Sequence, residues 1–402
     1  MWQAGVLLIF ILVVFSLGKS PVFRVDRAGA AIIAGALMVD FGMLTFEEAV
    51  KAIDFRTIVI LFFMMIVIAN LKVAGFFELI GAFILRNVST KKQLLLATVI
   101  TSGVLSAFCI NDIICLLFAP IILLVCQRSG CNPLPHLLGI AIASNVGSAA
   151  TFLGNPQNIL IANLSGVAFT DYSFTALPIV LIGLVVSYLV IMYGYRQQLQ
   201  GRIKLTEYGK IAVHKYLVIK SLIVLVLVII GYIAGQDLAI AASLGAAILL
   251  MTRRVEPNKI YTSIDFNLLV IFVGLFVLVG GLEHSGLMAV VVQNTVHYID
   301  FQNQIVFAAL IIVLSNIVSN VPAVLLLKFF LPATGADVLW KALALFSTFA
   351  GNLTITGSIA NLIVVEIAKR QNVNIRFGDY FKVGLPITII TALLGLTILK
   401  YF

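Results

Sequence analysis

The hydrophobic pattern of this chain consists of long apolar runs separated by short polar stretches. The runs have roughly the length of helices that cross a bilayer, about 17–25 residues, whereas a membrane barrel shows short alternating strands. The pattern predicts an all-α polytopic membrane protein with ten crossings, which cover residues 3–18, 28–43, 55–74, 133–165, 173–195, 216–234, 238–252, 266–283, 338–368 and 380–400.

The two halves of the chain carry the same pattern. Asp26 opens the run DRAGAAIIAGALMV, Asp237 opens DLAIAASLGAAILL 211 residues later, and Gly75 recurs as Gly286 at the same spacing. Each half holds five crossings, and because five is an odd number the second copy has to insert upside down, giving inverted-topology repeats. We therefore divide the chain into a first membrane repeat (1–195), a cytoplasmic linker (196–215) and a second, inverted repeat (216–402).

The distribution of charge agrees with this inverted topology. Placing the N-terminus outside puts 21 of the 26 Lys and Arg residues in inner loops, as the positive-inside rule requires. With 61% hydrophobic and only 11% charged residues, the net charge of +9 reflects membrane orientation, and we expect no nucleic-acid partner. The chain is thus expected in the cytoplasmic (inner) membrane of a prokaryote, with both termini outside.

Two further elements are predicted between the third and fourth crossing of each half. A short helix covers 76–87 or 287–298, and a helix–break–helix hairpin follows at about 93–127 or about 304–331. We favour re-entrant hairpins, because the first tip, Cys-Ile-Asn-Asp, lacks the Gly and Pro of a solvated turn. In the alternative, arms of about 15–17 residues carry the tip to the far surface, and the overall topology is unchanged.

Four polar stretches break the apolar runs: 109–113 and 318–322 in the hairpins, and 144–158 and 351–361 in the fourth crossings. Non-helical backbone survives at membrane depth only where protein or a water-filled cavity satisfies its polar groups. Helix N-termini at such breaks carry partial positive charge, and glycines let a ligand approach the backbone. Because the breaks contain no Lys or Arg, an anion would be held by amides and dipoles, and a small cation by carbonyls and Asn oxygens.

A single Ser or Asn in a membrane helix more often joins neighbouring helices, but four clusters at equivalent repeat positions favour a ligand site. The candidate substrate-binding residues are Asn111, Ser144, Asn145, Gly147, Ser148, Thr151, Gly154, Asn155, Asn158, Ser319, Asn320, Asn352, Thr354, Thr356, Gly357, Ser358 and Asn361.

Asp112 is the only carboxylate in the four breaks, and its counterpart in the second half is Val321. An acid at membrane depth is costly to bury and is therefore a candidate for a functional role, here ion coupling. It could take up a proton, or bind sodium together with Asn111 and Asn145; the alternative is a helix cap for the second hairpin arm. Apart from such a sodium ion we expect no cofactor.

Other polar groups have simpler interpretations. Lys328 lies eight residues past Asn320, about 12 Å along a helix, from where its ammonium can reach the outer interface. Glu283 and His284 form an interfacial pair, with a proton relay through His284 as the alternative. The cysteines are interpreted as small apolar filler rather than as a soft-metal or arsenic site; they are Cys109, Cys115, Cys126 and Cys131.

Several of these motifs resemble the ion transporter superfamily, which contains arsenite-efflux permeases, related sodium–proton antiporters, citrate–metal symporters and divalent anion–sodium symporters. The resemblance covers nearly the whole chain, and the run Gly154-Asn-Pro-Gln-Asn158 is closest to the arsenite-permease branch. The other matching stretches are Asp26-Arg27-Ala-Gly-Ala, Asn111-Asp112, Ser144-Asn-Val-Gly-Ser, Ser319-Asn-Val-Pro322, Gly351-Asn-Leu-Thr and Gly357-Ser-Ile-Ala-Asn361.

The resemblance implies two hairpins that enter from opposite sides, two broken helices, and substrate and coupling ions held between their tips. It also implies a transport unit that slides against a scaffold, often in a homodimer. The anion symporters carry Ser-Asn-Thr at their tips, whereas these tips read Ile-Asn-Asp and Ser-Asn-Val, which puts a two-sodium dicarboxylate mechanism in doubt. The second broken helix is also shorter between its Asn and Gly, which suggests a reduced second site.

The leading hypothesis is a secondary active transporter of a small anion, either a carboxylate or an oxyanion, driven by a proton or sodium gradient. Arsenite efflux or sodium–proton exchange on the same fold is the alternative. A channel is a third, since channels use broken helices but need a continuous lined pore. The sequence has no HExxH motif and no Gly-rich phosphate loop, so we expect no enzyme.

Overall fold

The structure, a computed structural model, describes residues 1–402 apart from 21, 204–212, 253, 333 and 402. The described residues are helical, and their only extended pairings are the isolated bridges Lys19–Asp26 and Thr90–Arg202. The first half contains α1 (Trp2–Leu17), α2 (Arg27–Asp40), α3 (Phe46–Ala52), α4 (Phe55–Val73), α5 (Phe76–Asn87), α6 (Lys91–Phe108), α7 (Asn111–Ser129), α8 (Leu134–Ser148), α9 (Pro156–Ser165) and α10 (Phe169–Gly194). The second half contains α11 (Lys215–Ile233), α12 (Leu238–Leu250), α13 (Pro257–Tyr261), α14 (Phe266–His284), α15 (Leu287–Val296), α16 (Gln304–Val318), α17 (Asn320–Leu327), η1 (Lys328–Phe330), α18 (Asp337–Ala350), η2 (Ile355–Gly357), α19 (Ile359–Arg370) and α20 (Phe377–Leu399).

The helices of the second half follow in the order of the first, so that α1 to α10 correspond to α11 to α20. The helix caps repeat as well. Asp26 and Asp237 each accept a backbone N–H at the start of α2 and α12, and Asp54 and Asp265 do the same at α4 and α14. An aspartate cap satisfies an amide that the helix leaves unpaired. The recurring aspartates therefore start equivalent helices in both halves.

The predicted all-α polytopic fold is confirmed, and the predicted crossings agree with the helices to within a few residues. Among the described residues, six helices are long and apolar enough to cross a membrane, namely α4, α7, α10, α11, α14 and α20. The sequence interpretation missed the short helices α3 and α13, which precede the third crossing of each half. A capping box between Thr45 and Glu48 starts α3, and this pair is visible in the sequence.

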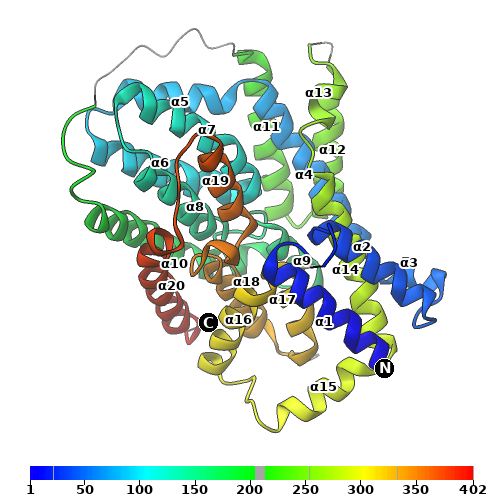
Figure 1. Ribbon diagram of the computed structural model, residues 1–402. Helices are drawn as coiled ribbons and strands as arrows, with labels where there is room; N and C mark the ends of the chain where they lie inside the picture. Colours follow the sequence, from blue (N-terminus) through cyan, green and yellow to red (C-terminus); the bar gives the residue numbers. More distant parts are fainter. Residues whose placement is uncertain (21, 204–212, 253, 333, 402) are drawn as a thin grey trace.

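Figure 1 shows the helices in two groups. We call α1, α2, α4, α11, α12 and α14 the first bundle, and α6, α7, α8, α10, α16, α18, α19 and α20 the second bundle. In the first bundle α2 packs against α14, and α12 packs against α4. Exchanging the halves turns one of these contacts into the other, so equivalent helices make equivalent contacts. Each bundle combines helices from both halves.

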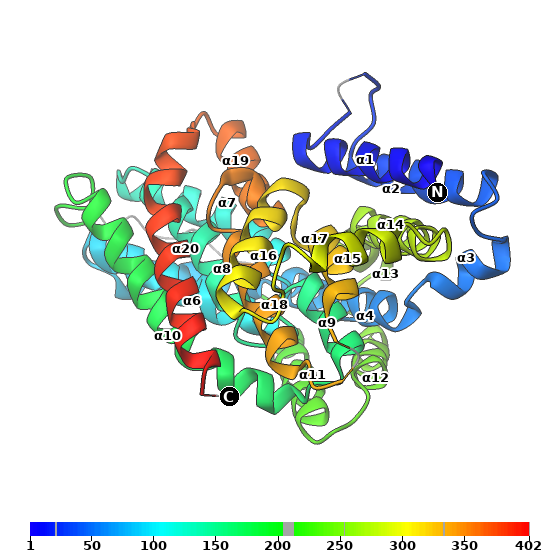
Figure 2. The same ribbon diagram turned by 90° about the horizontal axis from the view of Figure 1, so that it is seen from below.

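The contact between α10 and α20 shows how the two copies are oriented. Gly183, in the middle of α10, faces Thr391 in the later part of α20, whereas Gly194 at the end of α10 faces Val383 near the start of α20. The two helices, which lie side by side in Figure 2, therefore run antiparallel. Because α10 and α20 are equivalent helices, this is the orientation that an inverted repeat requires.

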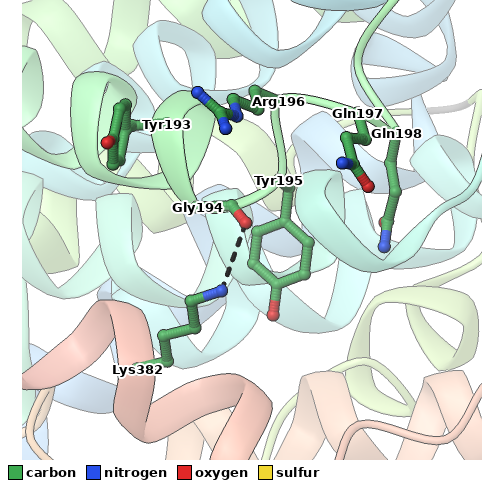
Figure 3. Close-up of a pocket in the computed structure, with 7 residues that line it drawn as sticks. All are labelled: Tyr193, Gly194, Tyr195, Arg196, Gln197, Gln198 and Lys382. Carbon is green, nitrogen blue, oxygen red and sulfur yellow. Dashed lines mark hydrogen bonds between the residues drawn. The ribbon is translucent and has the colours of Figure 1, made fainter.

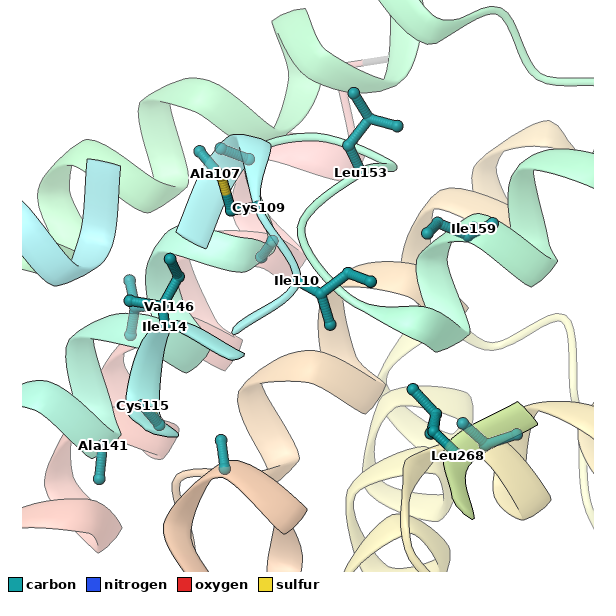
Figure 4. Close-up of a cluster of buried hydrophobic side chains, with 14 of the residues drawn as sticks. Ala107, Cys109, Ile110, Ile114, Cys115, Ala141, Val146, Leu153, Ile159 and Leu268 are labelled. Atoms are coloured by element: carbon teal, nitrogen blue, oxygen red, sulfur yellow. The ribbon is translucent and has the colours of Figure 1, made fainter. Parts of the chain in front are cut away.

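The tip of the first hairpin is buried among apolar side chains from α7, α8 and the α8–α9 connection (Figure 4). Ile110, Ile114, Val146, Leu153 and Ile159 are all fully buried there. The tip therefore lies inside the protein rather than at a surface turn, as the re-entrant interpretation predicts and the alternative does not.

Candidate functional site

Four helix N-termini meet around one small cavity. α7 begins at Asn111, α9 at Pro156, α17 at Asn320 and α19 at Ile359, so each of the four predicted breaks supplies one helix start. The cavity between them has a volume of about 20 Å³, which is room for about one water molecule. It is lined by Asn111, Asp112, Pro156, Gln157, Leu268, Ser319, Asn320, Val321, Ser358 and Ile359.

Asn145 connects the two halves at this site. Its Oδ1 accepts hydrogen bonds from Asn111 Nδ2 (3.0 Å) and Ser358 Oγ (3.1 Å). Its Nδ2 donates to the Oδ1 atoms of Asn352 (3.1 Å) and Asn361 (3.0 Å). Asn145 is 1% exposed, so this network is held away from water. The predicted residues from the first hairpin and both broken helices are therefore in direct contact.

Equivalent asparagines support the two broken helices in the same way. Asn158 Nδ2 donates to the carbonyl of Thr151 (3.5 Å), and Asn361 Nδ2 donates to the carbonyl of Thr354 (3.2 Å). Asn361 also donates to the carbonyl of Gly351 at 2.6 Å. These carbonyls have lost their helical partners at the breaks, and a buried carbonyl without a donor is costly. Asn158 and Asn361 thus stabilise the non-helical backbone of the breaks, in addition to any contact with a ligand.

A second buried cluster forms around Thr348 of α18, a residue that the sequence interpretation missed. Thr348 Oγ1 donates to the Ala344 carbonyl (2.8 Å), accepts from Asn155 Nδ2 (3.0 Å) and lies 3.4 Å from Asn158 Oδ1. Asn155 also donates to Ser148 Oγ (3.1 Å). Gln157 Nε2 lies 3.4 Å from the Thr348 hydroxyl. Two features of the sequence could have identified these residues. Thr348 lies three residues before a predicted break, and Gln157 lies inside the Gly-Asn-Pro-Gln-Asn run.

The tip of the second hairpin has a strained backbone. Ser319 connects α16 to α17 with φ 73° and ψ 162°, a region occupied almost only by glycine. With its amide oriented to match donors and acceptors, Asn320 donates to the carbonyls of Gly357 (3.2 Å) and Ser347 (3.0 Å). In this orientation it accepts from Gln157 Nε2 at 3.1 Å. The second tip therefore contacts the broken helices of both halves.

Asp112 lies in the first turn of α7, where no side chain caps the helix, so the alternative interpretation as a cap of this hairpin arm is wrong. Its half-buried carboxylate instead accepts the backbone N–H of Ala360, in the first turn of α19. Two charged residues at helix starts in the first bundle also act on the Asp112 carboxylate: Arg27 attracts its negative charge, and Asp265 repels it. Asp112 therefore links the first hairpin to a broken helix of the other half.

Other predicted residues face neighbouring helices rather than the cavity. A Cβ atom on Gly147 would lie 2.1 Å from the Gly103 carbonyl oxygen, and one on Gly154 would lie 2.1 Å from the Ser148 carbonyl oxygen. These glycines therefore permit close backbone packing. The Thr151 hydroxyl donates to the Ala107 carbonyl.

Three more predicted residues lie around Asn316 of α16, and a fourth, Ser144, lies between helices of the first half. Thr354 Oγ1 donates to Asn316 Oδ1 at 2.9 Å, and the exposed Thr356 hydroxyl lies 3.2 Å from that of Thr354. A Cβ atom on Gly357 would lie 2.7 Å from Asn316 Oδ1. The hydroxyl of Ser144 contacts the thiol of Cys115 at 3.0 Å.

Polar groups outside the cavity have structural surroundings. Lys328 Nζ lies 4.9 Å from the centre of the Phe329 ring, and His284 Nδ1 lies 4.0 Å from Glu48 Oε1 with both side chains substantially exposed. All four cysteines are buried free thiols. Within the described part of the chain no group of three His, Cys, Asp or Glu side chains is placed to hold a metal ion.

Four helix N-termini contribute partial positive charge to the cavity, whose walls contain no Lys or Arg and one carboxylate, that of Asp112. Two buried polar atoms of the adjoining network have no hydrogen-bond partner, Asn111 Oδ1 and Asn352 Nδ2. The N–H donors suit an anion, whereas the free Asn111 oxygen and the Asp112 carboxylate suit a small cation. The Asn145 oxygen already accepts two hydrogen bonds.

Comparisons with known proteins identify what this arrangement resembles. Residues 7–350 match the family model described as citrate transporter. An uncharacterized transporter of Mycobacterium tuberculosis is 31% identical over 409 residues, which cover 94% of this chain and 95% of the relative. A silicon efflux transporter of Oryza sativa subsp. japonica is 26% identical, covering 94% of this chain and 93% of the relative.

The fold also occurs in a solved structure. The Alcanivorax borkumensis YdaH transporter, whose crystal structure is described as having an unusual topology, superimposes with a TM-score of 0.60. The match covers 100% of this chain and 96% of that chain at 14% sequence identity. At this identity the similarity concerns the fold alone.

Proposed function

The chain belongs to the citrate transporter family and is a membrane transporter, and from this we propose that it moves a small anion by alternating access. The anion would be a carboxylate or an oxyanion, and a proton or sodium gradient would drive its movement. The resemblance of the chain to transporters supports a lipid bilayer as its environment and transport rather than catalysis as its role. We propose the inner membrane of a bacterium, with both termini outside and a homodimer as the assembly.

One observation carries this proposal, namely the convergence of four helix N-termini on one cavity that has no Lys or Arg in its walls. Each N-terminus leaves backbone N–H groups unpaired and carries partial positive charge. A site made of such groups holds an anion without Lys or Arg, which favours release of the anion once the site opens. The substrate would lie among Asn111, Asn145, Asn320, Asn352 and Ser358.

The present cavity, of about 20 Å³, is much too small for a citrate-sized anion. Binding therefore requires the hairpin tips to separate from the starts of α9 and α19. The arrangement of helices in two bundles supports a movement of the second bundle, with its hairpins, along the first. Such a movement would expose the site alternately to the two sides of the membrane.

We propose Asp112 as the coupling residue. Its carboxylate occupies the start of α19, where it accepts the Ala360 N–H. Protonation, or a sodium ion bound by Asp112 and the free Asn111 Oδ1 beside Asn145, would remove that negative charge and free the N-terminus for the substrate. This would link binding of the anion to binding of the coupling ion.

A second candidate function is the efflux of an uncharged or weakly acidic oxyacid, such as arsenous or silicic acid. It is favoured by the relative named a silicon efflux transporter and by the wholly amide and hydroxyl character of the buried network. Sodium–proton exchange on the same fold would need the carboxylate but no anion site. A channel is the least favoured alternative, because a cavity of about 20 Å³ does not form the continuous lined pore that a channel needs.

Uptake into proteoliposomes tests the proposal. Radiolabelled citrate is offered under an imposed proton gradient, an imposed sodium gradient, or neither, with phosphate, arsenite and silicic acid as competitors. We expect accumulation above equilibrium with one gradient, and its collapse on addition of the matching ionophore. Efflux of arsenite or silicic acid without anion uptake would favour the second candidate. Single-channel currents, or sodium–proton exchange without substrate, would overturn the proposal.

A further inference from the structure

A second pocket lies far from the central cavity, where the end of α10 meets the first turns of α20. It has a volume of about 360 Å³ and is lined by Tyr193, Gly194, Tyr195, Arg196, Gln197, Gln198 and Lys382 (Figure 3). Figure 3 shows Arg196 and Lys382 on opposite sides of the Gly194 carbonyl. The pocket therefore contains two cations and four amide or phenol groups where the last helix of one half meets that of the other.

The polar groups of this pocket are mainly free donors. Lys382 Nζ donates one hydrogen bond to the Gly194 carbonyl (3.3 Å), which leaves two of its three N–H groups. Arg196 stacks on the Tyr193 ring, with its Cζ 5.7 Å from the ring centre. Neither cation has a carboxylate partner among the ion pairs of the described residues. Two unpaired cations with free N–H groups match an oxyanion such as a phosphate.

The negative charge near the pocket belongs to Asp379, whose carboxylate already accepts a hydrogen bond from the backbone. Asp379, which acts electrostatically on Tyr195, accepts the backbone N–H of Arg376 (3.1 Å) at the start of α20. Tyr195 donates its hydroxyl to the backbone carbonyl of Asp379 (3.1 Å). Burial raises the pKa of Tyr195 to about 12, so this phenol adds no negative charge at neutral pH. The net charge of the pocket is therefore positive.

The position of the pocket favours a lipid over a soluble anion. α10 and α20 are both long and apolar enough to span a membrane, and the pocket lies at the end of one and the beginning of the other. Tyr193, in the last turn of α10, is 75% exposed, as expected for an aromatic residue at the boundary between lipid and water. Basic pockets between membrane helices at this depth bind anionic headgroups.

We propose that this pocket binds the phosphate of an anionic phospholipid between Arg196 and Lys382. The lipid would join the last helix of one half to that of the other, at the contact where the two copies run antiparallel. The binding does not depend on which anion is transported, and it would strengthen the second bundle as a unit.

Binding of dioleoylphosphatidylglycerol to the purified full-length protein in detergent tests this proposal, with dioleoylphosphatidylcholine as the uncharged comparison. The test variant is Arg196→Gln/Lys382→Gln. The matched control is Arg86→Gln/Lys92→Gln, which removes the same charges from exposed positions in α5 and α6. At about a fivefold effect per cation, the test variant should bind phosphatidylglycerol roughly thirty-fold more weakly. The control should bind like the unmodified protein.

The single variant Lys382→Arg keeps the positive charge, so it should bind phosphatidylglycerol nearly as tightly as the unmodified protein. This result would show that the weaker binding of the test variant comes from the lost charge and not from a folding defect. Equal binding of phosphatidylglycerol by the test and control variants would overturn the proposal, because it would show attraction by overall charge alone. Saturation of the pocket by inorganic phosphate or glycerol phosphate at similar concentrations would also overturn it. The ligand would then be a soluble anion rather than a lipid.

Discussion

Asn145 is the side chain through which the broken helices and the first hairpin are joined. It makes four hydrogen bonds to Asn111, Ser358, Asn352 and Asn361. At the scale of single residues, the sequence could predict these amides because Asn is unusual inside an apolar wall. It could not predict that Asn145, rather than its equivalent Asn352, would make all of these contacts, since that depends on how the halves meet.

Asn145→Ala should weaken both stability and ligand binding. Four buried partners would lose their hydrogen bond, and the loss is expected to cost about 3 kcal/mol of unfolding free energy. Thermal unfolding in detergent, with and without citrate, measures both effects. Asn163→Ala is the control, because Asn163 makes one hydrogen bond to Thr57 and lies outside the cavity. An Asn145→Ala protein that is stabilised by the ligand as strongly as the control would contradict the proposed site.

Variants of Ser319 can separate the effect of its strained backbone from that of its hydroxyl group. Its φ of 73° and ψ of 162° suit glycine, so Ser319→Gly should raise the melting temperature, whereas Ser319→Ala keeps the strain. If strain is retained because the hydroxyl contacts the substrate, both variants should transport poorly. Uptake assays and thermal unfolding of the two variants give the answer. A more stable Ser319→Gly protein with undiminished uptake would show that the hydroxyl has no such contact.

At the scale of elements, the helices and breaks could be predicted because each break interrupts an apolar run with polar residues that include at least one Asn. The short helices α3 and α13 were missed because seven or five residues give too short a periodic pattern. The roles of the glycines were also incompletely predicted. Gly147 and Gly154 were expected to admit a ligand, but they admit the backbone of a neighbouring segment.

Gly147→Ala should disrupt the contact between α6 and α8. The added Cβ would lie 2.1 Å from the Gly103 carbonyl oxygen, which belongs to the backbone and cannot rotate away. We expect a loss of about 1–3 kcal/mol or more in stability, as for other overpacked interiors. At Gly139, also on α8, the nearest atom is the flexible end of Leu95, 3.2 Å away. Thermal unfolding should therefore show a much smaller change for Gly139→Ala, and equal melting temperatures would refute this account of the contact.

At the scale of the whole molecule, the spacing of Asp26 and Asp237 revealed the repeat, and an odd number of crossings implied inversion. The sequence could not show that helices of one half pack against helices of the other. α2 packs on α14 and α4 on α12, and the buried Lys341 of α18 pairs with Asp171 of α10 at 2.8 Å. Such contacts depend on the fit of two surfaces far apart in the chain. The division at 196–215 remains a prediction, and residues 204–212 lie outside the described part.

The proposed mechanism places the coupling charge where the first hairpin meets the N-terminus of α19. Asp112 has no acidic counterpart in the second half, where Val321 occupies the equivalent position. A neutral side chain at position 112 would leave the four helix N-termini in place and remove only the group that responds to the ion. Substrate exchange and ion-driven accumulation should therefore respond differently to this change.

Gradient-driven uptake by Asp112→Asn in proteoliposomes is the most direct test, with the exposed Glu47→Gln as the matched loss of one carboxylate. We expect Asp112→Asn to exchange labelled for unlabelled substrate across the membrane but to accumulate no more with a gradient than without one. Glu47→Gln should accumulate like the unmodified protein. Full ion-driven accumulation by Asp112→Asn would contradict the account.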